Sequence, residues 1–238
     1  MAKHIPHIFI NKNNLESFEI IDDDFAHLTR VLRFKVGDKF IILDNQGLKA
    51  NCIIESISKN KLNFNIIDKE IYNNDNLKLH LIQAITKIET FEEILDKSTQ
   101  LGISTITPVI TENVNTSIDI FNKKIIRFNK IIKSASEQSQ RIFLPELKPI
   151  IKLNDFYNNF DSDNTFIAYE KATKPFKDCL NNYNKNEINV LCGTEGGFTQ
   201  KEFEILSKKF KTFSLGKNIL RAETAVISII SNINFALI

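Results

Sequence analysis

The chain has 238 residues, of which 42% are hydrophobic and 25% are charged, and its formal net charge is +2. This composition is typical of a globular protein and excludes a polycation that binds nucleic acid by overall charge alone. No apolar stretch reaches the roughly 18–20 residues of a transmembrane helix, and the N-terminus lacks a hydrophobic signal core. We therefore expect a cytoplasmic protein with no membrane partner.

Cysteine and histidine predict no metal site. The three cysteines, Cys52, Cys179 and Cys192, lie far apart and form no CxxC pair, so neither a disulfide framework nor a zinc knuckle is predicted. His4 and His7 have ligand-like spacing, but no nearby cysteine or acidic residue completes a coordination set. The more economical interpretation is two polar residues near the start of a strand.

Residues 1–73 are predicted to form a small β-rich domain. An apolar run at residues 5–10 precedes a helix that three aspartates open at residues 22–24, where acidic side chains favour a helix N-terminus. Strands separated by polar turns follow at residues 39–44, 48–56 and 62–68, a compact barrel-like pattern. The polar segment 72–76 is the predicted linker, so the second domain spans residues 74–238.

Strands and helices alternate through the second domain, which indicates an α/β fold with a largely parallel sheet. Strands are predicted at residues 77–85, 105–110, 165–169, 188–192 and 212–215, and helices at residues 90–101, 119–138, 199–209 and 222–238. Between residues 120 and 148, seven basic residues stand against two acidic ones. That distribution fits contact with a phosphate backbone or a solvated helix face equally well.

The segment Gly193-Thr194-Glu195-Gly196-Gly197 joins a buried strand to a helix. Its glycines permit positive φ angles and close approach of a ligand, and ligands bind at the carboxyl ends of strands in open α/β sheets. The spacing matches neither the dinucleotide-binding pattern GxGxxG nor a P-loop. By pattern alone the ligand is a nucleotide, a phosphate or a nucleoside-like cofactor, unless the turn only joins the two elements.

A second strand-to-helix junction follows at Leu215-Gly216 and the residues after it. Arg221 and Glu223 stand at the start of its helix, where they either present polar groups to a ligand or form a surface ion pair of little energetic value. Two such loops, close in sequence and leaving strands at the same edge, predict one shared pocket.

Together the two junctions resemble the paired signature of the RsmE family of methyltransferases, in the SPOUT superfamily. The second junction reads Leu215-Gly216, two residues, then Ile219-Leu220-Arg221-Ala222-Glu223-Thr224-Ala225. Residues 27–33, 93–102 and 136–141 also resemble family segments, in the family's order along the chain. Two departures are visible: Thr194 stands where the family usually has proline, and Lys217-Asn218 where it commonly has Pro-Arg.

The resemblance implies a PUA-like β-barrel that binds RNA, followed by a SPOUT methyltransferase domain with a C-terminal trefoil knot. It also implies a homodimer, S-adenosyl-L-methionine (SAM) as cofactor, and N3 of a uridine in 16S rRNA of the small ribosomal subunit as methyl acceptor. The family's cofactor site, carried over, comprises Leu191, Gly193, Gly196, Gly197, Leu215, Ile219, Leu220 and Tyr169, with Glu170 beside the last.

The implied reaction removes a proton from uracil N3 and places negative charge on the ring oxygens, so it needs a base and a cationic or hydrogen-bonding partner. Arg221 is the candidate for charge stabilisation, and Glu223 or Glu195 for proton handling or positioning. Either glutamate can instead cap backbone N–H groups at a helix start.

Candidate RNA contacts are Arg30 and Arg33, about one helical turn apart, and Glu137, Gln138 and Arg141 near the substrate entrance. A polar cluster at a helix end is the alternative for the last three. The final helix carries an apolar stripe that fits either a dimer interface or buried core: Val226, Ile229, Ile230 and Ile233.

Two other functions stay open at this point. One is a SPOUT methyltransferase that modifies another target, such as a ribose hydroxyl or a guanine. The other is a non-catalytic RNA-binding assembly factor that keeps the fold, against which the intact glycines and Arg221-Ala222-Glu223-Thr224 argue. Loss of SAM binding is the property that favours the assembly factor.

Overall fold

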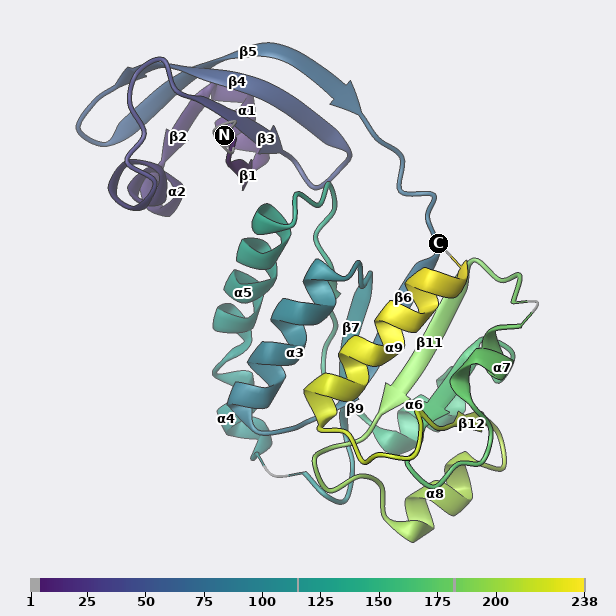
Figure 1. The fold of residues 1–238 in the computed structure, drawn as a ribbon. Helices are drawn as coiled ribbons and strands as arrows, with labels where there is room; N and C mark the ends of the chain where they lie inside the picture. Colours follow the sequence, from purple (N-terminus) through teal and green to yellow (C-terminus); the bar gives the residue numbers. More distant parts are fainter. Residues whose placement is uncertain (1–4, 115, 182, 238) are drawn as a thin grey trace. The chain divides into compact units, whose positions relative to one another are not determined.

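A computed structural model describes residues 5–114, 116–181 and 183–237 of the chain (Figure 1). The chain divides into two compact units. The first is Met1–Asp75 with Ser136–Leu144, and the second is Asn76–Ala135 with Pro145–Ile238. No helix within the described residues is both long and apolar enough to cross a membrane.

The first unit is built around a five-stranded sheet with the order β1-β3-β4-β5-β2. Strand β1 pairs parallel with β3, and the other pairs are antiparallel. Because β1 and β2 form its two edges and do not pair with each other, the sheet is an open half-barrel rather than a closed barrel. Its core contains side chains such as Phe40 and Phe64. The strands are β1 (His7–Phe9), β2 (Glu19–Ile21), β3 (Lys39–Leu43), β4 (Leu48–Ile57) and β5 (Lys61–Ile71).

Short helices lie between β1 and β3. Helix α1 (Lys12–Ser17) precedes β2, and α2 (Asp22–Ala26) begins at the predicted aspartates. Helix α2 runs directly into a π-helical turn, η1 (His27–Val31), and Arg33 just beyond it has a left-handed φ of 55°. Arg30 and Arg33 are both exposed on this irregular segment.

The segment Ser136–Leu144 belongs to the first unit although it interrupts the second in sequence. The Leu144 N–H donates to Asn45 Oδ1 at 2.6 Å, and the Phe9 N–H donates to Glu137 Oε1 at 3.0 Å. Ile142 and Leu144 also pack against three apolar side chains of the sheet, Phe9, Ile41 and Leu43. Local sequence patterns do not report such long-range contacts, so the membership of Ser136–Leu144 in the first unit was not predicted.

The second unit is a parallel sheet with helices on both faces, as the alternation of elements predicted. Its order is β12-β10-β11-β6-β7-β8, with β9 beside β7, and every pair is parallel. The strands are β6 (Lys78–Ala84), β7 (Thr105–Ile110), β8 (Glu146–Leu147), β9 (Ile151–Lys152), β10 (Thr165–Ala168), β11 (Glu187–Cys192) and β12 (Lys211–Phe213). The helices are α3 (Ile88–Gln100), α4 (Ile118–Asn122), α5 (Ile125–Gln138), α6 (Leu153–Asn159), α7 (Phe176–Leu180), α8 (Gln200–Leu206) and α9 (Ala222–Leu237).

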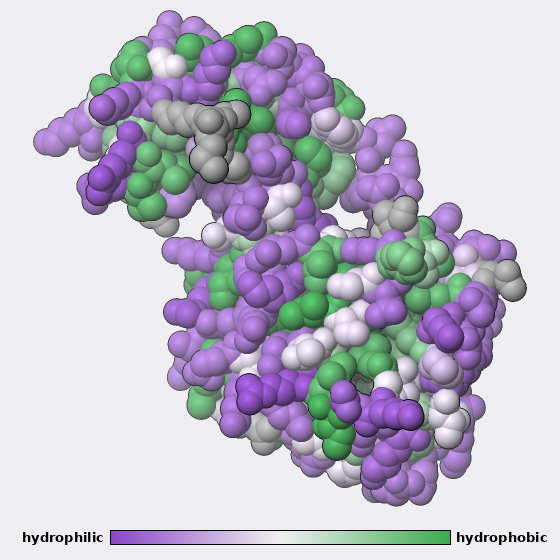
Figure 2. Space-filling model, in the orientation of Figure 1, coloured by the Kyte–Doolittle hydropathy of each residue, from purple (hydrophilic) through white to green (hydrophobic). Residues whose placement is uncertain are grey.

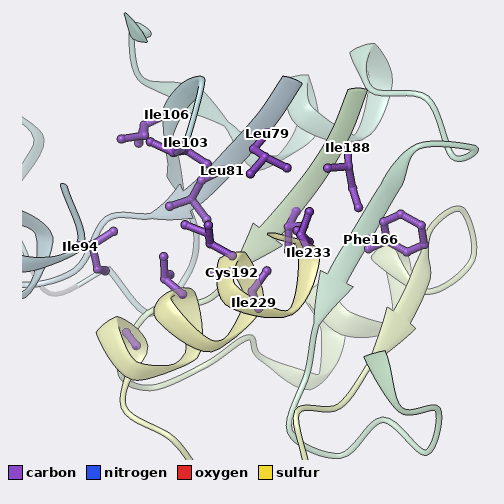
Figure 3. Packing of buried hydrophobic residues seen from close by; sticks show 14 of the residues in the cluster. Leu79, Leu81, Ile94, Ile103, Ile106, Phe166, Ile188, Cys192, Ile229 and Ile233 are labelled. Atoms are coloured by element: carbon purple, nitrogen blue, oxygen red, sulfur yellow. The ribbon is translucent and has the colours of Figure 1, made fainter. Parts of the chain in front are cut away.

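Two hydrophobic cores cover the two faces of this sheet. On one face α3 and α9 lie side by side, and Figure 3 shows Ile229 and Ile233 of α9 near residues of β6 and β11. On the other face α6 and α8 pack through residues such as Phe156 and Leu206. The apolar stripe of α9 is at most 2% exposed within a single chain. It is therefore core, and its assignment to a dimer interface is wrong.

The helix predicted over residues 119–138 is two helices. Helix α4 ends at Asn122, where the Lys123 N–H bonds to the carbonyls of Asp119 and Phe121, and α5 begins at Ile125. One phenylalanine from each helix, Phe121 and Phe128, packs on Phe91 of α3. Apolar spacing continues across the break, so the pattern alone predicted one helix.

Candidate cofactor pocket

A pocket lies at the carboxyl ends of β10, β11 and β12, where parallel strands bring their following loops to one edge of the sheet. Both glycine-containing loops contribute to it. The first loop comprises residues 193–198, after β11, and the second comprises residues 214–221, after β12. The remaining lining comes from the ends of β10 and β11, the two residues after β10, and the start of α9. The lining residues are Ala168, Tyr169, Glu170, Cys192, Gly193, Thr194, Gly197, Phe198, Ser214, Leu215, Gly216, Asn218, Leu220, Ala222 and Ala225.

Thr194 closes the turn of the first loop with its hydroxyl group. Its Oγ1 accepts a hydrogen bond from the Gly196 N–H at 3.2 Å, and its carbonyl accepts one from the Gly197 N–H at 3.0 Å. Gly197 has a φ of 67°, which few residues other than glycine adopt. The threonine therefore supports a tight turn where the family usually has proline. The helix α8 that follows has the predicted capping box, between Thr199 and Glu202.

Two side chains from outside the turn hold the first loop. Gln83 Nε2 donates to the Gly193 carbonyl at 2.9 Å, and Asn113 Nδ2 donates to the carbonyls of Gly196 and Gly197 at 3.3 and 3.2 Å. Neither Gln83 nor Asn113 was predicted as a site residue. The only signal for Gln83 is its place as a polar residue at the end of an apolar strand.

A third contact holds the first loop through one of its own side chains, that of Glu195. Its Oε1 accepts a hydrogen bond from the Lys87 N–H at 3.2 Å, and Lys87 is the N-cap residue of α3. The carboxylate thus pairs with one of the backbone N–H groups that a helix start leaves without an intrahelical partner. This contact is the capping role that the sequence left open beside a catalytic one.

The second loop is more exposed and makes its turn locally. Ser214 Oγ accepts from the Gly216 N–H at 3.2 Å and donates to the Gly216 carbonyl at 3.0 Å. Lys217 and Asn218, the pair that departs from the family pattern, are exposed, and Asn218 lines the pocket. Ile219 is 85% exposed.

Five of the eight expected cofactor residues line the pocket: Tyr169, Gly193, Gly197, Leu215 and Leu220. Within the described part of the chain, the other three lie outside its lining. Leu191 is buried in the core beneath it, whereas Gly196 and Ile219 are exposed. Cys192 contributes a neutral thiol to the lining, because burial raises the pKa of that thiol to about 12.

Arg221 and Glu223 lie at the start of α9, beside the lining residues Leu220 and Ala222. Arg221 is exposed and Glu223 is half-buried. Among residues 5–114, 116–181 and 183–237, neither side chain forms an ion pair or a hydrogen bond, so the surface ion pair considered above does not form. The guanidinium of Arg221 is thus exposed next to the pocket.

The expected RNA contacts all belong to the first unit. Glu137 accepts a hydrogen bond from the backbone of β1, as described above, and Gln138 is exposed. Arg141 Nε donates to the Phe143 carbonyl at 3.2 Å, and burial lowers the pKa of Arg141 to about 10. Arg30 and Arg33 are the more exposed cations of this set.

Comparison with known proteins assigns both units to families. The RNA methyltransferase domain family matches residues 73–234, and the RNA methyltransferase PUA domain family matches residues 20–67. Ribosomal RNA small subunit methyltransferase E of Buchnera aphidicola is 35% identical to this chain over 237 residues. The match covers 94% of this chain and 90% of the Buchnera protein. The chain belongs to the ribosomal RNA small subunit methyltransferase E family.

Solved structures of two proteins similar to this chain contain the cofactor that the resemblance implied. Methyltransferase E of Neisseria gonorrhoeae, solved with S-adenosyl methionine bound, has a TM-score of 0.87 and 27% identity, and the match covers 98% of both chains. A methyltransferase of Legionella pneumophila, solved in complex with SAM, has a TM-score of 0.88 and 28% identity, again over 98% of both chains. The predicted family, and its fold of a PUA-like domain followed by an α/β methyltransferase domain with a parallel sheet, are thereby confirmed.

Proposed function

We propose that this protein is a SAM-dependent methyltransferase that modifies N3 of a uridine in 16S rRNA of the small ribosomal subunit. The observation that carries the proposal is the pocket that both family loops line, in a chain whose relatives with SAM bound match it over almost its whole length. The curated relatives are named as enzymes of small-subunit ribosomal RNA.

The lining of the pocket suits SAM. Gly197 leaves room beside the backbone, where a Cβ would meet only Glu170 Oε2 at 3.8 Å, and Leu215 and Leu220 offer apolar surface for the faces of an adenine. Glu170 brings an exposed carboxylate to a site that would receive a cationic sulfonium. When bound, SAM supplies an electrophilic methyl group.

Residues of this chain would handle the charge and the proton of the uracil. Deprotonation at N3 leaves negative charge on the ring oxygens, and the exposed guanidinium of Arg221 is suited to stabilise it. Glu223, half-buried at the start of α9, is the better candidate for accepting the proton, because Glu195 already binds the Lys87 N–H. The role proposed for Glu195 is therefore positioning.

RNA binding, the knot and the dimer complete the proposal. Arg30 and Arg33 would contact phosphates, and Glu137, Gln138 and Arg141 would add polar contacts from the same unit. The trefoil knot would bring the segments after β11 and β12 together around the cofactor.

A homodimer would cover apolar surface that a single chain leaves exposed, such as Ile219 and Phe235, which is 94% exposed on α9. In Figure 2, which has the orientation of Figure 1, pale and green atoms lie among hydrophilic ones over the region of α9.

The test is a map of modified bases in small-subunit rRNA from cells that lack the protein, followed by addition of purified protein and SAM. We expect one 3-methyluridine to disappear and to return only with active protein. Loss of a different methylated nucleotide would support the methyltransferase activity and show that the proposed target is wrong. No change in methylation, together with no SAM binding, would favour the RNA-binding assembly factor.

A further inference from the structure

A side-chain amide at the end of β6 holds the first loop from beneath. Gln83 is fully buried and lies opposite Cys192 in the pairing of β6 with β11. Its Nε2 donates to two carbonyl oxygens, those of Ala84 and Gly193, each at 2.9 Å. Because both partners can only accept, the orientation of the amide is fixed.

The amide oxygen of Gln83 is buried without a hydrogen-bond partner among the described residues. An unpaired buried carbonyl lowers stability, and an apolar side chain of similar length would avoid that loss. The unpaired oxygen of Gln83 therefore lowers the stability of the fold, whereas its nitrogen holds the first loop by a hydrogen bond. This combination points to a role in the site rather than in the core.

A second amide holds the other end of the loop. Asn113, which follows β7, donates from Nδ2 to the carbonyls of Gly196 and Gly197, again two groups that only accept. A trans peptide is planar, so fixing a carbonyl oxygen also fixes the direction of the N–H on the opposite edge. The two amides thus set the directions of the peptide planes after Gly193, Gly196 and Gly197.

We propose that Gln83 and Asn113 are positioning residues that hold the first loop in its SAM-binding conformation before SAM binds. The inference rests on the proposed function, because it takes the pocket as the SAM site. Neither residue lines the pocket, so each acts through the loop backbone. A loop fixed in advance loses less conformational entropy on binding, which increases affinity.

The test compares SAM binding by calorimetry and thermal unfolding in the full-length wild type, Gln83→Met and Asn113→Asp. Methionine keeps the length of glutamine without its donors, and aspartate replaces the donors of the half-buried Asn113 with acceptors. Each substitution should raise the Kd for SAM about fivefold to tenfold, the size expected for a lost hydrogen bond. Gln83→Met should change Tm little, because removing the unpaired oxygen offsets the loss of the donor to the Ala84 and Gly193 carbonyls. The KM for SAM should rise while kcat at saturating SAM stays near the wild-type value.

Thr111→Val is the matched control. Thr111 is buried and its Oγ1 also has no partner among the described residues, but it does not contact the loop through a hydrogen bond. This variant should keep the wild-type Kd and should not lower Tm. Equal weakening of SAM binding by Thr111→Val would overturn the inference, because the cause would then be general loosening of the unit.

The remaining outcomes separate the inference from the proposed function. If the wild type does not bind SAM, the proposed function fails. If the wild type binds SAM and both Gln83→Met and Asn113→Asp bind it equally well, the inference is wrong and the function stands. If Gln83→Met does not fold, Asn113→Asp decides alone, because its site is half-buried beside a loop.

Discussion

The two loops that line the pocket differ in what holds them. The first loop is held by Gln83, Asn113 and the contact of Glu195 with Lys87, so three segments outside it fix its position. The second loop makes its turn through Ser214 and Gly216, and the residues after that turn are exposed. A loop fixed in advance suits the recognition of a cofactor, whereas an exposed loop can become ordered when its partner arrives.

This difference suggests a division of labour. The first loop would supply a preformed wall for SAM. The second would carry Arg221 to the methyl acceptor, and its exposed Lys217, Asn218 and Ile219 would contact RNA or a second subunit. The substitutions below test this division, and they run from the largest expected effect to the smallest.

Arg221→Ala should produce the largest loss. Removing the exposed guanidinium should lower kcat for rRNA methylation by about 10²–10³-fold, as for loss of a group that stabilises transition-state charge. The Kd for SAM should stay close to that of the wild type, because Arg221 does not line the pocket. Lys217→Ala, which removes another exposed cation of the same loop, is the control and should lower kcat far less. Equal losses in the two variants would assign Arg221 to general attraction of RNA.

Gly193→Ala should weaken SAM binding more than Gly196→Ala, although both change the same loop. A Cβ at position 193 would lie 3.2 Å from the Gly197 Cα and 3.3 Å from its carbonyl carbon, so the loop backbone must move. The cost of overpacking, about 1–3 kcal/mol, corresponds to a Kd raised by about fivefold to a hundredfold. A Cβ at position 196 would make only ordinary contact, at 3.6 Å, with the Asn113 side chain. Equal Kd values for the two variants, measured by calorimetry, would show that the loop is not held as described.

Glu195 distinguishes positioning from proton transfer. Glu195→Gln keeps an oxygen that can accept from the Lys87 N–H, so we expect a kcat near the wild-type value. Glu195→Ala removes that contact and should lower the free energy of unfolding by about 0.5–1 kcal/mol, as for a lost helix cap. Thermal unfolding and single-turnover methylation measure the two effects. A loss in Glu195→Gln of about 10²-fold or more would instead assign general acid–base catalysis to this carboxylate.

The sequence predicted the parts of this molecule that depend on local pattern. The main strands of the parallel sheet, the two strand-to-helix loops and the capping box at Thr199 all follow from spacing and residue type. Contacts between distant segments were not predictable in this way. Gln83 and the Gly193 carbonyl are 110 positions apart, and neither amide belongs to a motif. Likewise, the membership of Ser136–Leu144 in the first unit depends on packing against β1 and β3, which a helical periodicity does not encode.

The last comparison, which includes the smallest expected effect, concerns the two hydroxyl groups that close the turns. Thr194→Val and Ser214→Ala each remove an oxygen that accepts from the glycine N–H two positions later. The hydrogen bond from the Gly196 N–H to Thr194 is partly buried, so its loss should lower the free energy of unfolding by about 1 kcal/mol. Ser214 is half-buried in the exposed loop, where water can replace the hydroxyl, and its loss should lower that free energy by no more than a few tenths of a kcal/mol. Urea unfolding with unchanged m-values measures both changes. A larger loss for Ser214→Ala would mean that the second loop is the more firmly held of the two and would reverse the division of labour.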